Sequence, residues 1–124
     1  MRGYGSYKAS STKNAPKYQV VTMLFQEAVK RLSRAASSER TDAAWLRDLH
    51  HCREIFLELS NGLDPAAAPE LCQHLAPLYS WCIDELIAAG VENSPERANN
   101  VLRVTKTLLD GWTSALKQPQ KVPA

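Results

Sequence analysis

The sequence APKYQVVTMLFQEAVKRLSRAA, residues 15–36, decides the fold of this chain. Its apolar residues recur every three or four positions, which is the spacing that places side chains on one face of an α-helix. These apolar residues are Val21, Leu24, Phe25, Ala28, Val29, Leu32 and Ala36. Pro16 suits a first helical turn, where the backbone N–H that proline lacks would have no helical partner. The stretch therefore predicts an amphipathic helix from about Pro16 to Ala36, which buries one face and carries no catalytic grouping.

A second helix is predicted after the polar break at residues 37–42, and it continues to about Ser60. Ser38 and Thr41 are the candidate N-caps, because a hydroxyl oxygen can accept a hydrogen bond from a free N–H of the first turn. Gly62 is the candidate C-cap, since glycine adopts the left-handed conformation without a Cβ clash. The apolar stripe of this helix consists of Trp45, Leu49, Cys52, Phe56 and Leu59.

Proline and serine signals mark two further helices. The third follows Pro69 and ends near residues 89–90, with an apolar stripe of Leu71, Leu75, Leu78, Cys82 and Leu86. The fourth starts with Ser94 as N-cap and Pro95 in its first turn, and it stops before Gln118. Its stripe consists of Ala98, Val101, Leu102, Thr105, Leu108, Leu109, Trp112 and Leu116.

Four helices with short connections predict an all-α fold, an antiparallel up-and-down four-helix bundle. We assign residues 16–116 to the bundle, residues 1–15 to a flexible, mobile N-terminal arm and residues 117–124 to a flexible C-terminal tail. Pro77 interrupts the third helix, because proline lacks a backbone donor and crowds the carbonyl four residues earlier. We expect either a kink there or a short segment at residues 70–76 that breaks from the main helix.

The composition of the 124 residues, with 44% apolar and 23% charged, is that of a globular protein. No apolar run approaches the ~20 residues that span a bilayer, and the N-terminus lacks the apolar core of a secretory signal. We therefore expect a cytoplasmic protein without membrane insertion, whose three cysteines, Cys52, Cys72 and Cys82, are buried and reduced. Between Pro16 and Leu116, ten Lys and Arg stand against thirteen Asp and Glu, a net charge of −3, which argues against a nucleic-acid surface.

The sequence contains no grouping of side chains typical of an active site. Adjacent helical residues point about 100° apart, so His50, His51 and Cys52 cannot converge on one metal ion. There is no glycine-rich phosphate loop, no Ser/His/Asp pattern and no Cys-x-x-Cys pair. A small helical-bundle enzyme would hold a dianionic substrate with several buried cations, and only Arg31 and Arg53 approach an apolar stripe. We therefore predict that the chain is not an enzyme and binds neither metal nor cofactor.

The second and third helices carry more apolar surface than a bundle helix needs to face its core. Leu46 and Leu57 lie outside the main stripe of one, and Ile83 and Ile87 extend the apolar arc of the other. One interpretation is that both helices are central, with two neighbours each. The other is an apolar groove between them, with these four residues as its wall, that receives a partner helix. Arg53 then pairs with a carboxylate of the partner or lies along the bundle.

The residues before the first helix include two tyrosines, Tyr4 and Tyr7, in a stretch otherwise rich in Gly, Ser and Lys. Two tyrosines in such a stretch are hard to explain as core residues. An aromatic side chain on a flexible arm can dock into an exposed groove. We therefore predict that this arm covers the groove while no partner is bound.

Five short motifs occur in order along most of the chain. They are Tyr7 ahead of Ala15-Pro16, the step Met23-Leu24-Phe25, the run Leu59-Ser60-Asn61-Gly62-Leu63-Asp64, the run Leu78-Tyr79-Ser80-Trp81, and Trp112 in the last helix. With this order and spacing the chain resembles the flagellar export chaperones of the FliS family. It departs from the family at Gln26, where an acidic residue is common, and at Pro77. These two positions bear on the local geometry of the first and third helices.

The resemblance implies a non-enzymatic cytoplasmic chaperone that binds the disordered C-terminal segment of flagellin. Such a chaperone prevents premature polymerisation and delivers flagellin to the export gate of the flagellar apparatus. The resemblance also implies that Tyr7, with Tyr4, covers the groove in the free protein, and we expect a monomer or a weak dimer. An adaptor bundle that binds another amphipathic helix shares every physical feature of this chaperone and differs only in its partner.

Overall fold

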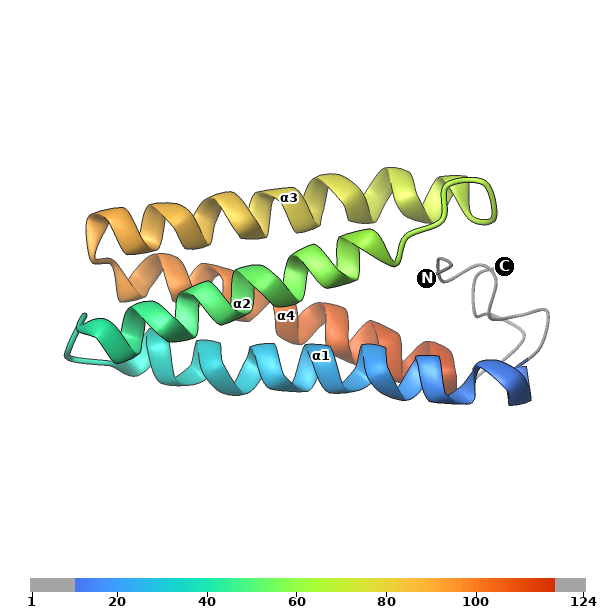
Figure 1. The fold of residues 1–124 in the computed structure, drawn as a ribbon, viewed down its shortest axis with the longest axis horizontal. Helices are drawn as coiled ribbons and strands as arrows, with labels where there is room; N and C mark the ends of the chain where they lie inside the picture. The colour runs from blue at the N-terminus through green and yellow to red at the C-terminus, as the bar shows by residue number, and fades with distance from the viewer. Residues whose placement is uncertain (1–10, 118–124) are drawn as a thin grey trace.

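The computed structural model describes residues 11–117, with side chains from Pro16 onward, and this part of the chain forms four α-helices in one bundle (Figure 1). The helices are α1 (Ser11–Ser37), α2 (Ala43–Asn61), α3 (Pro69–Glu92) and α4 (Pro95–Leu116). α1 packs against α2 and α4, and α3 packs against the same two helices. The predicted all-α, antiparallel up-and-down bundle is confirmed.

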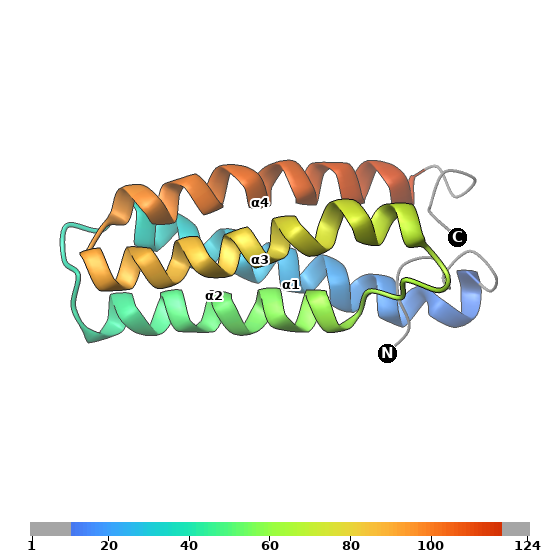
Figure 2. The same ribbon diagram turned by 90° about the horizontal axis from the view of Figure 1, so that it is seen from above.

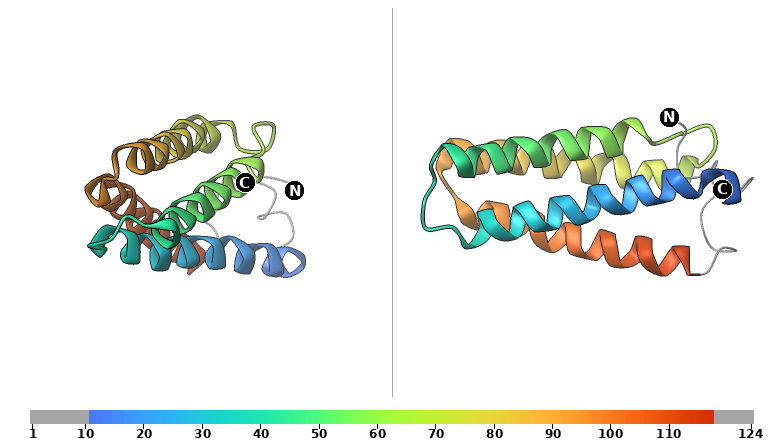
Figure 3. Two further views of the ribbon diagram at one scale, coloured as in Figure 1. Left: turned by 60° about the vertical axis from the view of Figure 1, so that its left-hand side comes forward. Right: turned by 60° about the horizontal axis from the view of Figure 1, so that its bottom comes forward.

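The four helices are not evenly spaced along the bundle. Figure 2 shows α2, α3 and α4 side by side in chain order, and the right-hand view of Figure 3 shows α1 between α2 and α4. In Figure 1 the α2–α3 pair and the α1–α4 pair diverge toward the end where α3 begins and α4 finishes. The bundle is therefore tighter at the end that holds the α1–α2 and α3–α4 connections.

The first helix begins earlier than the sequence predicted. α1 starts at Ser11 and not near Pro16, so Pro16 lies inside the helix, and residues 11–15 are helical where we expected an arm. Residues 1–10 of the predicted arm, and 118–124 of the predicted tail, lie outside the described residues. None of the described helices is long and apolar enough to cross a membrane.

The N-cap of α2 differs from both predicted candidates. Asp42 is extended at φ −92° and ψ −170°, and its carboxylate accepts a hydrogen bond from the Trp45 backbone N–H at 3.1 Å. Ser38 instead bonds within the preceding turn, where its hydroxyl donates to the Arg40 carbonyl. Ser38 and Thr41 were therefore wrong as caps, because the residue directly before the first helical residue supplies the acceptor.

The other helix boundaries agree with the sequence predictions in part. Ser94 caps α4 as predicted, since its hydroxyl accepts the Arg97 N–H at 3.2 Å and Pro95 follows it. Gly62 is the C-cap of α2 as predicted, but it is not left-handed: its φ is −80°, because its N–H continues the helical pattern of α2. The left-handed residue is Asn93, with φ 52°, and it ends α3 at Glu92, beyond the predicted stop at residues 89–90.

Pro77 does not break α3. The helix is continuous from Pro69 to Glu92, so the predicted separate segment at residues 70–76 is wrong. Both Pro77 and Gln73, whose carbonyl loses its helical donor, are exposed to solvent. Water can satisfy that carbonyl, which is why the helix tolerates the proline.

The core is a column of buried side chains from all four helices, and the predicted stripes of α1, α2 and α4 face it. On α3 the prediction was less accurate. Tyr79 is fully buried and its ring packs against Phe56 with centroids 5.9 Å apart, whereas Leu71, Leu75 and Leu78 are only half-buried. The three cysteines are free and buried, as predicted.

Candidate functional site

A mainly apolar hollow of about 510 Å³ lies between α2 and α3 at the tight end of the bundle, and we call it the α2–α3 groove. Its lining residues are Leu46, Arg47, Leu49, His50, Arg53, Leu86, Ile87, Gly90 and Val91. The first five come from the first three turns of α2 and the last four from the C-terminal end of α3. Antiparallel packing brings these two segments to the same level, so neither segment forms the groove alone.

The walls of the groove leave large apolar side chains open to solvent. Leu46 and Ile87 are each 44% exposed, and Val91 is 77% exposed. Gly90 contributes no side chain to the α3 wall. A Cβ at that position would lie 3.5 Å from Leu46 Cδ2 and would occupy part of the groove. Exposed apolar side chains gathered in one hollow are typical of a surface that a partner covers.

The structure brings together three of the five residues nominated from the sequence. Leu46, Arg53 and Ile87 line the α2–α3 groove. Leu57, 45% exposed, and Ile83, half-buried against the core, do not line it. Their spacing from Leu46 and Ile87 along each helix places them on the same rows of side chains, one turn or more further along the bundle.

Arg53 lies along α2 at the edge of the groove. Its Nη2 donates a hydrogen bond to His50 Nδ1 at 3.0 Å, and His50 Nε2 lies 3.5 Å from a Glu54 carboxylate oxygen. Because a guanidinium has only donors, His50 Nδ1 is the acceptor in this contact. The contact holds Arg53 outside the bundle interior, with its charge at the surface.

Sequence reasoning missed a second apolar hollow, of about 210 Å³, which we call the α1–α3–α4 hollow. It is lined by Phe25, Leu71, Leu75, Tyr79, Thr107, Leu108, Gly111 and Trp112. Most of these residues lie on stripes that the pattern assigned to the core. The signal in the sequence was Gly111 next to Trp112 of the α4 stripe, and in the structure a Cβ at Gly111 would meet nothing within 4 Å.

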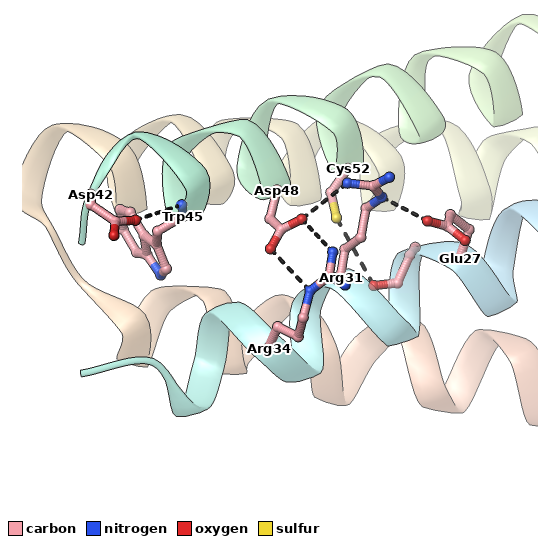
Figure 4. Close-up of polar contacts among 8 residues, drawn as sticks. Glu27, Arg31, Arg34, Asp42, Trp45, Asp48 and Cys52 are labelled. Atoms are coloured by element: carbon pink, nitrogen blue, oxygen red, sulfur yellow. Dashed lines mark hydrogen bonds and ion pairs between the residues drawn. The ribbon is translucent and has the colours of Figure 1, made fainter. Parts of the chain in front are cut away.

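A polar cluster joins α1 to α2 (Figure 4). Asp48 accepts hydrogen bonds from Arg31 Nη1 at 3.0 Å and from Arg34 Nη2 at 2.7 Å, and Arg31 also pairs with Glu27. The hydrogen bond and the charge of Asp48 raise the pKa of Arg34. These arginines are paired with carboxylates between two helices and do not converge on a substrate site, which disfavours the small-enzyme alternative.

The His, Cys, Asp and Glu side chains considered as metal ligands or nucleophiles are not arranged for those roles in the described residues. Within residues 11–117 no three His, Cys, Asp or Glu side chains are grouped to hold a metal ion. The Cys52 thiol is buried and lies 3.9 Å from the Ala28 carbonyl oxygen, to which it donates (Figure 4). Burial raises the pKa of Cys52 and of Cys82 to about 12, so neither thiol supplies a nucleophilic thiolate near neutral pH.

Comparison with known proteins gives consistent matches over nearly the whole chain. The sequence model of the family described as "Flagellar protein FliS" matches residues 1–119. The flagellar secretion chaperone FliS of Campylobacter jejuni is 30% identical over 111 residues, which cover 88% of this chain and 87% of that protein. The flagellar secretion chaperone FliS of Escherichia coli K12 is 26% identical over 117 residues, with 91% and 85% covered.

Proposed function

Because this chain belongs to the FliS family of flagellar secretion chaperones, we propose that it binds the C-terminal segment of flagellin in the α2–α3 groove. As a member of this family the protein is a non-enzymatic chaperone. The observation that carries the choice of site is the exposure of Leu46, Ile87 and Val91 in one hollow between two helices. That hollow suits the apolar face of an amphipathic helix.

Binding in this groove explains how a small bundle prevents self-association of its client. A disordered amphipathic segment exposes the apolar face through which it would associate with other copies. The groove covers that face, and the segment gains helix as it binds. The entropy lost in ordering the segment offsets part of the gain from apolar burial, so the complex stays releasable.

The place of action and the assembly state belong to the same proposal. The protein acts in the cytoplasm, where it holds flagellin before export and delivers it to the export gate of the flagellar apparatus. It works as a monomer or a weak dimer, which sedimentation at several protein concentrations measures directly. A stable dimer that persists on dilution would contradict this part of the proposal.

The distance that the N-terminal tyrosines can span bears on which apolar hollow each of them could cover. The hydrogen bonds from Arg31 and Arg34 to Asp48 place the α2–α3 groove level with Arg31 of α1. Arg31 lies about 30 Å along the helix from Ser11 at 1.5 Å per residue. The chain from Ser11 spans at most about 14 Å to Tyr7 and about 25 Å to Tyr4, so Tyr7 falls short of that level and Tyr4 reaches it only with the chain fully extended and its ring included.

The α1–α3–α4 hollow is within reach of the arm. Trp112, which lines it, donates a hydrogen bond from Nε1 to Thr22 Oγ1 at 2.7 Å, so the hollow lies near the level of Thr22. That level is about 17 Å along α1 from Ser11, a distance that the chain to Tyr7 and its phenol ring together span. We therefore assign Tyr7 to this hollow, where the arm shields apolar surface in the free protein.

Calorimetric titration with the flagellin C-terminal peptide of the same organism tests the proposed function. We expect binding with a negative heat-capacity change and a gain of helix. Ile87→Asp puts a charge in the groove and should weaken binding by about tenfold or more, since it removes the burial of a large apolar side chain. Val20→Asp is the matched control, because Val20 is 48% exposed on α1 and lines neither apolar hollow.

The two variants separate the groove from the fold. Circular dichroism should give the same helix content for Ile87→Asp, Val20→Asp and the unmodified chain. Equal weakening by both substitutions would remove the groove as the binding site. Absence of binding by the unmodified chain would overturn the flagellin assignment itself.

A further inference from the structure

Charge is distributed unevenly over the bundle. Residues 30–53 contain six Lys and Arg against three Asp and Glu, whereas residues 54–116 contain three against nine. The positive segment covers the end of α1, the α1–α2 connection and the first half of α2. α3 contains four acidic residues and neither Lys nor Arg. In the α2–α3 groove itself, the charged lining residues are Arg47 and Arg53 of α2, and no Asp or Glu lines it.

The positive charge gathers in an open hollow of about 830 Å³ beside the α1–α2 connection. Four arginines line it: Arg31, Arg34, Arg40 and Arg47. The first two are paired with Asp48, but the guanidinium groups of Arg40 and Arg47 make no hydrogen bond or ion pair within the described residues. Of the other acidic residues lining this hollow, Asp42 caps α2 and Glu39 is exposed.

This hollow adjoins the apolar groove. Arg47 and His50 line both, so the α2 ridge that carries them separates a charged hollow from an apolar one. Arg53 extends the same ridge, and its described hydrogen bond goes to the neighbouring His50. A helix that lies in the α2–α3 groove therefore has Arg47 and Arg53 along one of its edges.

We propose that Arg40, Arg47 and Arg53 bind carboxylates on one flank of the segment held in the α2–α3 groove. The partner is then an amphipathic helix with an apolar face and an acidic edge, and the acidic edge faces α2. This inference rests on the proposed function, because it describes the segment that occupies the same groove. The α3 wall of the groove has no charged lining residue, so the arginines of α2 set which way the helix is rotated about its axis.

Charges at the rim of an interface act mainly on the association rate and on its salt dependence. The double variant Arg40→Glu and Arg47→Glu should therefore slow association with the flagellin C-terminal peptide by about tenfold at low ionic strength. The effect should shrink toward none at about 1 M salt, where the Debye length is about 3 Å. The double variant Arg40→Gln and Arg47→Gln should give a smaller loss of the same kind.

Two matched controls sharpen the experiment. Arg103→Glu with Lys106→Glu makes the same change in net charge on the exposed face of α4 and should change the association rate less than twofold. A second peptide, with every Asp and Glu replaced by Asn or Gln, should bind the unmodified chain more slowly. That peptide should show no further loss with the Arg40 and Arg47 reversal, because the partner charges are gone.

The outcomes separate this inference from the proposed function. Equal association rates for the unmodified chain and the Arg40 and Arg47 variants would overturn the inference, while binding in the groove stands. Equal loss with the α4 control would also overturn it, because net charge alone would then explain the effect. Failure of the unmodified chain to bind the peptide would overturn the proposed function, and the inference with it. Circular dichroism confirms that each variant is folded.

Discussion

At the scale of single residues, two buried thiols should make the stability of the fold depend on pH in the alkaline range. Burial raises the pKa of Cys52 and Cys82 to about 12, with the nearby carboxylates Asp48 and Glu85 as the next contributions. Tyr18 changes in the same direction, because burial raises its pKa. These groups remain protonated in the folded chain at pH values where they ionise in the unfolded chain.

We predict that the free energy of unfolding falls as the pH rises from about 9 toward 12. The folded pKa of each thiol is raised, so its contribution is complete below the unfolded value and is lost as pH approaches the folded one. Within this window each thiol lowers the free energy of unfolding by up to about 1.4 kcal/mol for each unit of pH increase. Urea unfolding at pH 8, 9 and 10 measures the slope.

The control is the double variant Cys52→Ala and Cys82→Ala. It starts from a lower stability, because it leaves small cavities, but its dependence on pH should be flatter than that of the unmodified chain. The same slope in both proteins would assign the alkaline loss to other groups.

At the scale of single elements, α2 depends on its cap. We predict that Asp42→Ala lowers the free energy of unfolding by about 1 kcal/mol, because it removes the side-chain acceptor for the Trp45 N–H. Asp42→Asn keeps an acceptor and should recover most of the loss. Thermal unfolding of the three proteins measures the difference, and equal stability of the Ala and Asn variants would contradict the role of the side chain.

α3 contains a proline whose replacement should stabilise the helix. Because Pro77 is exposed and the helix continues through it, we predict that Pro77→Ala raises the free energy of unfolding by about 1–3 kcal/mol. The new N–H restores the bond to the Gln73 carbonyl. Ser80→Ala, at an exposed position one turn further along, controls for helix propensity alone. A gain no larger than that of the control would mean that the surrounding helix is adapted to proline.

At the scale of the whole molecule, the number of residues between Ser11 and Tyr7 limits which apolar hollow Tyr7 can reach. We predict that a nitroxide attached at Lys8→Cys broadens the methyl signals of Leu75 and Leu108, which line the α1–α3–α4 hollow. The signals of Leu46 and Val91, in the α2–α3 groove, should stay sharp. The opposite pattern would contradict this assignment and would support covering of the α2–α3 groove by Tyr4 and Tyr7.

The helix caps show what the sequence could not predict, namely which of several suitable residues caps a given helix. Ser38, Thr41 and Asp42 are all acceptable cap residues, and only the path of the chain between α1 and α2 selects the last of them. The same holds for Gly62 and Asn93. Glycine is the easier residue to place in the left-handed region, but α3 needs that conformation at Asn93 and α2 does not need it at Gly62.

The sequence by itself determined the four helices, the antiparallel bundle and most of the buried faces, because a repeat of three and four residues is a local property of each helix. It also indicated Leu46 and Ile87, since an apolar arc wider than the core requires is visible in the pattern. Only the tertiary structure decided which of the apolar residues outside the core stripes line the same groove. Neighbouring helices pack closely at one end and diverge at the other, and that spacing is set by contacts between residues far apart in the chain.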